Sequence, residues 1–232
     1  MVQPILLTRP IAQSKAFWDS VSKRFPERFD PVLSPLLEIR AETAQIDTTG
    51  AQALLFTSRN AVDQFAMRSD ARDVPALCVG DATAALARQH GLSASSAGGD
   101  AAALAGLAAA SYVPGSGHFI HFRGAHAAGS LVDALLAEGI EAEERILYDQ
   151  HARALTEEAQ TMLSRFSTIV PLFSPRTSAV FHDALQHLSA KPPHIVAISE
   201  AAAAPIRRVP HQSLQIASAP NAQAMLDALA AF

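Results

Sequence analysis

The stretch FTSRNAV at residues 56–62 has a counterpart in FSPRTSAV at residues 173–180. Each begins in an apolar run and passes through hydroxyl-bearing residues into a segment with helical spacing, which predicts a junction between a strand and a helix. A second junction follows each at a similar distance, VGDATA at residues 79–84 and ISEAAA at residues 198–203. The repeated order predicts two related structural units.

Short runs of Val, Ile, Leu and Phe alternate with Ala-rich segments of helical period along the chain. This pattern is typical of an α/β protein whose parallel strands are buried on both faces. We expect strands at residues 3–7, 28–33, 53–56, 76–79, 92–95, 119–122, 141–146, 168–173, 194–198 and 213–217. Since these are too many for one small domain, the predicted fold is α/β with two similar five-stranded parallel-sheet lobes.

A third similarity sets the order of the lobes along the chain. ILLTR at residues 5–9 and IHFRG at residues 120–124 each precede a predicted helix, but one lies before its unit and the other after it. The simplest assembly is a discontinuous first lobe, residues 1–34 plus 150–232, with residues 38–146 inserted as the second lobe. Asp100 and Asn221 are the expected N-caps of the last helix in each unit.

Composition narrows the class of protein. Hydrophobic residues make up 49% of the chain and charged residues 17%, which excludes a disordered protein. No apolar run approaches membrane-spanning length, and the net charge of −4 argues against general binding of nucleic acid. The single cysteine, Cys78, lies in a predicted buried strand and cannot form an intramolecular disulfide. We therefore expect a cytoplasmic protein with no nucleic-acid or membrane partner.

Ligands of open parallel sheets bind beyond the carboxyl ends of the strands, where helices begin. The backbone N–H groups there attract anions, each contributing roughly 0.3–1 kcal/mol, so several such ends suit a ligand with many carboxylates. Ordinary N-capping is the alternative for each hydroxyl. The candidate substrate-binding residues are Arg9, Thr57, Ser58, Asn60, Gly80, Thr83, Arg123, Gly124, Ser174, Arg176, Thr177 and Ser199.

No cofactor motif is present. VGDATA lacks the further glycines of a dinucleotide fingerprint, and the chain has no P-loop or Gly-x-Ser-x-Gly turn. His118, His121 and His126 lie close in sequence, but no cysteine or paired carboxylate completes a metal site. We expect neither a metal nor an organic cofactor.

Tyr148 is one of only two tyrosines and falls at the second predicted crossing between lobes. A phenol there would face the cleft between the lobes and donate a proton or a hydrogen bond. The alternative is a half-buried linker aromatic with a hydrated hydroxyl.

Several short pieces, in this order and spacing, resemble the uroporphyrinogen-III synthase family along nearly the whole chain. They are LTRP at residues 7–10, FTSRNAV, VGDATA, FRG at residues 122–124, LLAEG at residues 135–139 with the following Leu147-Tyr148, FSP at residues 173–175 and the closing helix after Pro220-Asn221. The resemblance implies two lobes joined by a two-stranded connection. It also implies a lyase that cyclises hydroxymethylbilane to uroporphyrinogen III, inverting the terminal pyrrole through a spiro intermediate.

The resemblance also implies roles for individual residues. Tyr148 matches the family's tyrosine, expected to assist departure of the hydroxyl group, and Thr57, Ser58, Thr83 and Ser174 match its hydroxyl-bearing turns. Two stretches depart from the family pattern. Many relatives have Gly-Pro-Thr-Thr where this chain has SEAA at residues 199–202, and residues 125–129 lack the arginine that commonly follows Arg-Gly. We expect a monomer acting on a small-molecule substrate.

Two other functions fit parts of the pattern. A non-catalytic two-lobed binding module of the periplasmic type shares the architecture but usually carries an export signal, and none is visible. A nucleotide-sugar transferase or methyltransferase needs a glycine-rich nucleotide loop, which the sequence lacks.

Overall fold

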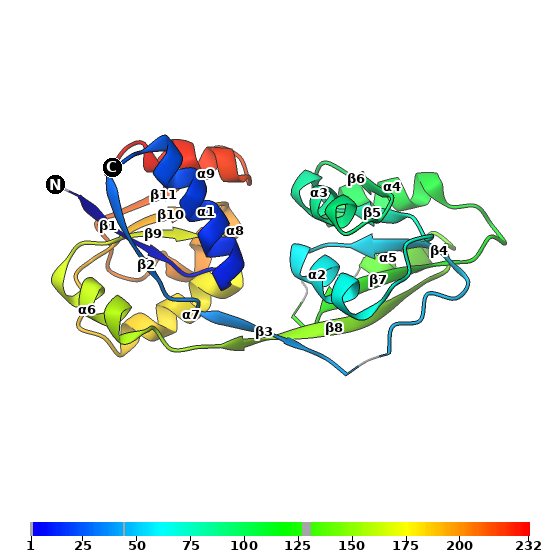
Figure 1. The fold of residues 1–232 in the computed structure, drawn as a ribbon, viewed down its shortest axis with the longest axis horizontal. Coiled ribbons are helices and arrows are strands. Elements are labelled where there is room, and N and C mark those ends of the chain that lie inside the picture. Colours follow the sequence, from blue (N-terminus) through cyan, green and yellow to red (C-terminus); the bar gives the residue numbers. More distant parts are fainter. Residues whose placement is uncertain (1, 44, 127–130) are drawn as a thin grey trace. The chain divides into compact units, whose positions relative to one another are not determined.

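The computed structural model describes residues 2–43, 45–126 and 131–232. The chain forms two compact units (Figure 1). Unit 1 comprises Met1–Glu38 and His151–Phe232, and unit 2 is the continuous segment Ile39–Gln150. Within the described residues, no helix combines the length and the apolar character needed to cross a membrane.

Unit 1 is built on a five-stranded sheet in the order β11-β10-β9-β1-β2, with all neighbouring strands parallel. Its strands are β1 (Gln3–Leu7), β2 (Phe29–Leu33), β9 (Ile169–Leu172), β10 (His194–Ala197) and β11 (Ser213–Ile216). Its helices are α1 (Ile11–Arg24), α6 (Glu157–Arg165), α7 (Pro175–Gln186), α8 (Glu200–Ala203) and α9 (Ala222–Leu229), with a 3₁₀ turn at Ala204–Ile206.

Alternation along β1 creates the two cores of unit 1. Ile5 and Leu7 pack with α1 and α9 on one face of the sheet, whereas Leu6 packs with α6 and α7 on the other (Figure 1). Because successive side chains of a strand point to opposite faces, a continuous apolar run such as that of β1 requires helices on both.

Unit 2 contains a six-stranded sheet in the order β3-β8-β7-β4-β5-β6. Its strands are β3 (Leu37–Ala41), β4 (Ala51–Phe56), β5 (Ala76–Cys78), β6 (Ala94–Ser96), β7 (His118–Gly124) and β8 (Ala142–Ala152). α2 (Arg59–Arg68) and α3 (Asp81–Gln89) cover the face that contains Phe56 and Phe122. α4 (Ala101–Ser111) and α5 (Leu131–Ala137) cover the face that contains Leu55 and Phe119.

The predicted α/β class is confirmed and parallel pairing dominates both sheets, but the expectation of five parallel strands in each lobe is wrong for unit 2. The sixth strand is β3, which lies beside β8 at the sheet edge. The Glu42 N–H donates to the Leu147 carbonyl and the Arg153 N–H to the Leu36 carbonyl, each at 2.9 Å. The sequence does not predict β3 because the strand is short and only its first residue is buried. Its stability depends on pairing with β8 more than on its own apolar pattern.

Candidate functional site

Tyr148 lies within β8, and its ring is 4% exposed in the core of unit 2 with Phe56 and Phe122. Its phenol oxygen is 2.9 Å from the Ser58 Oγ, and a further hydrogen bond joins it to the Asn60 side chain. Ser58 is the N-cap of α2 and accepts a hydrogen bond from the Ala61 N–H at 3.1 Å. The phenol is therefore hydrogen-bonded to the start of α2, the helix that follows β4.

The ring of Tyr148 rests directly against the backbone of β7. A Cβ atom on Gly124 would lie 2.6 Å from the Tyr148 Cζ and 2.9 Å from its hydroxyl oxygen. Gly124 and Tyr148 are paired across the sheet, next to an irregularity in the register after Arg123. A glycine is needed at position 124 because of this close approach.

The alternative for Tyr148 was a half-buried linker aromatic, but the core of unit 2 buries its side chain almost completely. Burial raises the pKa of the Tyr148 phenol, and hydrogen bonds with Ser58 and Asn60 lower it in part. The group is thus protonated at neutral pH, as a proton donor must be.

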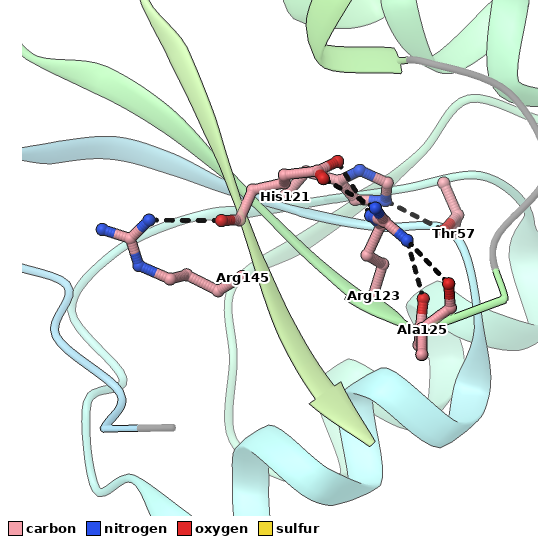
Figure 2. A network of polar contacts seen from close by, with 7 residues as sticks. Thr57, His121, Arg123, Ala125 and Arg145 are labelled. Carbon is pink, nitrogen blue, oxygen red and sulfur yellow. Dashed lines mark hydrogen bonds and ion pairs between the residues drawn. The ribbon is translucent and has the colours of Figure 1, made fainter. Parts of the chain in front are cut away.

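Thr57 and His121 form a second polar pair at the same edge of the sheet. The Thr57 Oγ1 is 3.0 Å from the His121 Nε2, and the imidazole is 3% exposed (Figure 2). Burial first, and then the positive charge of Arg123, lower the pKa of His121 to about 4, while Glu144 acts in the opposite direction. His121 is therefore neutral at physiological pH.

Arg123 is held by partners within unit 2. Its guanidinium forms two hydrogen bonds to the Glu144 carboxylate, at 2.8 and 2.6 Å, and one to the Gly124 carbonyl at 2.9 Å. Figure 2 shows the same guanidinium bonded to the backbone carbonyl of Ala125. The sequence predicts a substrate-binding arginine here, and such a role would require Arg123 to share or exchange these partners.

Gly80 and Thr83 lie at the start of α3. Gly80 is the N-cap and its carbonyl accepts from the Thr83 N–H at 3.1 Å, while the Thr83 side chain is 6% exposed. A Cβ atom on Gly80 would meet no other atom within 4 Å. Sterics therefore do not require glycine at this position.

In unit 1, the predicted hydroxyls cap helices. The Ser174 Oγ accepts from the Thr177 N–H at 3.1 Å and lies 2.9 Å from the Thr177 Oγ1. The Ser199 Oγ accepts from the Ala202 N–H at 3.3 Å. Capping is thus a role of Ser58, Ser174 and Ser199, although a serine that accepts one hydrogen bond can still donate its own proton. Glu200, next to Ser199, forms an ion pair with Arg207.

Two predicted arginines of unit 1 follow neighbouring strands of its sheet. The Arg9 guanidinium lies over the Phe173 ring, 4.2 Å from its centroid, and donates to the Gln13 side chain at 2.9 Å. Phe173 precedes the cap of α7, and Arg176 is in the first turn of that helix. Because β1 and β9 are adjacent, the segments that follow them place both half-buried arginines at the carboxyl edge of the same sheet.

The three histidines considered for a metal have separate contacts. His118 lies 3.7 Å from Glu143, His121 bonds Thr57, and His126 lies 3.1 Å from Asp149. Among the described residues, no three His, Cys, Asp or Glu side chains form a group suited to a metal ion. Burial raises the pKa of the Cys78 thiol to about 11, which fits the predicted core role. Residues 127–130, part of the stretch that lacks the family's arginine, are outside the described residues.

His121 is the buried partner of Thr57 that sequence reasoning missed, because it was weighed only as a metal ligand. The available signal was one imidazole within the otherwise apolar run FIHF of β7. A buried polar side chain in such a strand needs a hydrogen-bond partner, and the nearest hydroxyl is at the end of the adjacent strand.

The fold and these contacts define a two-unit α/β protein in which capped helices begin at the carboxyl ends of parallel strands, and in unit 2 a buried, protonated phenol lies beside the start of α2. A family model described as Uroporphyrinogen-III synthase HemD matches residues 27–227. The chain therefore belongs to the uroporphyrinogen-III synthase family, whose members act in tetrapyrrole biosynthesis.

Solved structures share the fold. Uroporphyrinogen-III synthetase from Helicobacter pylori 26695 is 18% identical and has a TM-score of 0.67, with 100% of this chain and 99% of that chain covered. A mutant uroporphyrinogen III synthase from the extremely thermophilic bacterium Thermus thermophilus is 14% identical and has a TM-score of 0.56, with 100% and 98% covered. A search of curated protein sequences gave no match.

Proposed function

We propose that this chain is a uroporphyrinogen-III synthase that cyclises hydroxymethylbilane with inversion of its terminal pyrrole. The observation that carries the proposal is the family match, which spans most of unit 1 and all of unit 2. The reaction requires a positioned substrate and one delivered proton, so it needs no nucleophilic side chain.

Tyr148 is the proposed proton donor. The Ser58 hydroxyl and the Asn60 amide donate to the phenol oxygen in this scheme, which directs the phenol proton toward the hydroxyl group of the bilane. As the C–O bond breaks, the departing oxygen takes this proton and leaves as water, while the pyrrole nitrogen supplies the electron pair. Loss of the N–H proton from that nitrogen then gives the neutral azafulvene. The two hydrogen bonds stabilise the phenolate until the proton released by the pyrrole nitrogen converts it back to the phenol.

The azafulvene is then attacked by the substituted carbon of the terminal pyrrole, which gives the spiro intermediate. Fragmentation and reclosure of this intermediate produce the inverted ring. These steps are rearrangements of the substrate, so the role of the protein is to hold the two ends of the bilane together.

The acetate and propionate groups are proposed to bind at helix starts in both units. Support comes from the N-termini of α2, α3 and α7, where backbone N–H groups favour anions. Arg9 and Arg176 add positive charge near the start of α7. Arg123 contributes less, because Glu144 already neutralises its guanidinium.

The decisive experiment couples the purified protein to an enzyme that generates hydroxymethylbilane and measures the ratio of type III to type I uroporphyrinogen. We expect type III product with a chelator present and without nucleotide. Only type I product from folded protein would overturn the proposal and favour the non-catalytic binding module. We also propose that the protein is a cytoplasmic monomer, which sedimentation of the purified chain and fractionation of cells would test.

A further inference from the structure

The pair Thr57–His121 contains a buried polar atom, on His121, that the proposed chemistry does not use. β4 and β7 are neighbours, with Leu55 opposite His121, so the imidazole reaches the residue that follows β4. Strand alternation places His121 on the face of Phe119, among the apolar side chains under α4 and α5. Within residues 2–43, 45–126 and 131–232, its Nδ1 has no hydrogen-bond partner.

The position of the single imidazole proton decides what Thr57 can do. If the proton were on Nδ1, a donor would be buried without an acceptor, and Nε2 would take the Thr57 hydroxyl proton. If it is on Nε2, His121 donates to Thr57 and Nδ1 remains an acceptor without a partner. Buried backbone donors without partners are rarer than under-satisfied acceptors, and the same cost favours the second arrangement here.

We propose that His121 is a positioning residue whose Nε2–H donates to the Thr57 Oγ1, so that the Thr57 hydroxyl proton is directed to a substrate carboxylate. This inference rests on the proposed function, since it takes the carboxylate to be that of the bilane. The half-buried Thr57 stands immediately before the cap of α2. With the opposite tautomer, Thr57 would present only lone pairs to an anion and would repel it.

The charges around His121 are consistent with a fixed neutral tautomer. Arg123 from the same strand and Glu144 from the opposing position on β8 are the charged groups that influence the imidazole, and they are paired with each other at 2.6 Å. A proton added to His121 would have to be accommodated in the apolar layer formed by Phe119 and Leu135.

The first test needs neither substrate nor catalysis. Long-range ¹H–¹⁵N correlation spectra of the unsubstituted protein at pH 7 distinguish a protonated ring nitrogen from a bare one, and His121→Gln assigns the signal by its disappearance. We expect Nε2 to be protonated and Nδ1 bare. The reverse pattern, or a doubly protonated ring, would overturn the inference whatever the enzyme assay gives.

The second test is a double-mutant cycle with His121→Phe and Thr57→Val. Thr57→Val is expected to raise KM about tenfold, as for loss of one hydrogen bond to a charged group, with little change in kcat. His121→Phe should raise KM less than Thr57→Val does. In a protein that already carries Thr57→Val, His121→Phe should not raise KM further. His121→Gln, whose amide can also donate, and Thr57→Ser, which keeps the hydroxyl, should restore much of the affinity.

The two levels of proposal fail in different ways. Absence of type III product from every sample would reject the enzyme but leave the tautomer result standing. Type III product with independent effects of the two substitutions on KM would retain the enzyme and reject the role of His121.

Discussion

The phenol oxygen of Tyr148 on β8 lies 2.9 Å from the Oγ of Ser58, the N-cap of α2. One serine therefore fixes the start of a helix and the orientation of the proposed acid. The proposed proton donation by Tyr148 and the packing of its ring can be tested separately, because different substitutions alter the hydroxyl and the space around the ring.

Tyr148→Phe keeps the ring and removes the proton. General acids contribute roughly 10²–10⁴-fold to rate, so we expect kcat to fall about 10²-fold while KM changes little. The coupled isomer assay measures both constants. Tyr112→Phe is the matched control, since the only other tyrosine packs against Phe119 at the end of α4 and should leave turnover unchanged. An unaltered rate for Tyr148→Phe would remove this residue from the mechanism.

Ser58→Ala should raise the pKa of Tyr148 further, because the Ser58 hydrogen bond lowers that pKa against the effect of burial. Tyrosinate absorbance, followed with Tyr112→Phe as background, reports Tyr148 alone. Loss of the cap should also cost about 1 kcal/mol of unfolding free energy. Thr156→Ala removes the comparable cap of α6 and should cost a similar amount without moving the titration. Equal titration curves for both substitutions would contradict the assigned contact.

Gly124→Ala should destabilise the protein by about 1–3 kcal/mol, the usual cost of overpacking a core. The new methyl would lie 2.6 Å from the Tyr148 Cζ, so the ring must shift and turnover should fall as well. Gly80→Ala is the matched control, because the space around its Cβ is open, and its cost should stay under about 1 kcal/mol. Chemical denaturation of the two variants makes the comparison, and equal losses would argue against close packing at Gly124.

Stability should fall between pH 7 and pH 5 because of His121. Its pKa is lowered from 6.5 to about 4 in the folded state, so the unfolded state binds more protons in this window. The contribution is fully present above pH 6.5 and is lost as the pH falls toward 4, with about 2 kcal/mol lost by pH 5. His121→Gln and His121→Phe should both flatten the denaturation free energy over this range. A pH dependence unchanged in both would show that His121 titrates normally.

The strand–helix junctions could be predicted from sequence because their signals are local. Phe56 and Phe173 end apolar runs, and the following serines cap helices through residues three positions away. Asp100 and Asn221 were predicted as N-caps for the same reason, and their contacts with Ala103 and Ala224 confirm it.

The missed features depend on partners that are distant along the chain. The arginine of FRG at residues 122–124 reads as an available cation, but strand register places Glu144 beside it. Tyr148 reads as a linker residue, because the extension of β8 to Ala152 and its pairing with β3 are set by tertiary contacts. The role of His121 likewise depends on the adjacency of β4 and β7.

The hydrogen bond from the Arg153 N–H to the Leu36 carbonyl lies where unit 2 departs from and returns to unit 1. A short turn that joins Leu36 to Arg153 would therefore make unit 1 one continuous chain. Residues 39–150 also begin and end on neighbouring strands, β3 and β8. An insertion at this single position interrupts unit 1 once, between β2 and α6, and leaves every strand of its sheet intact.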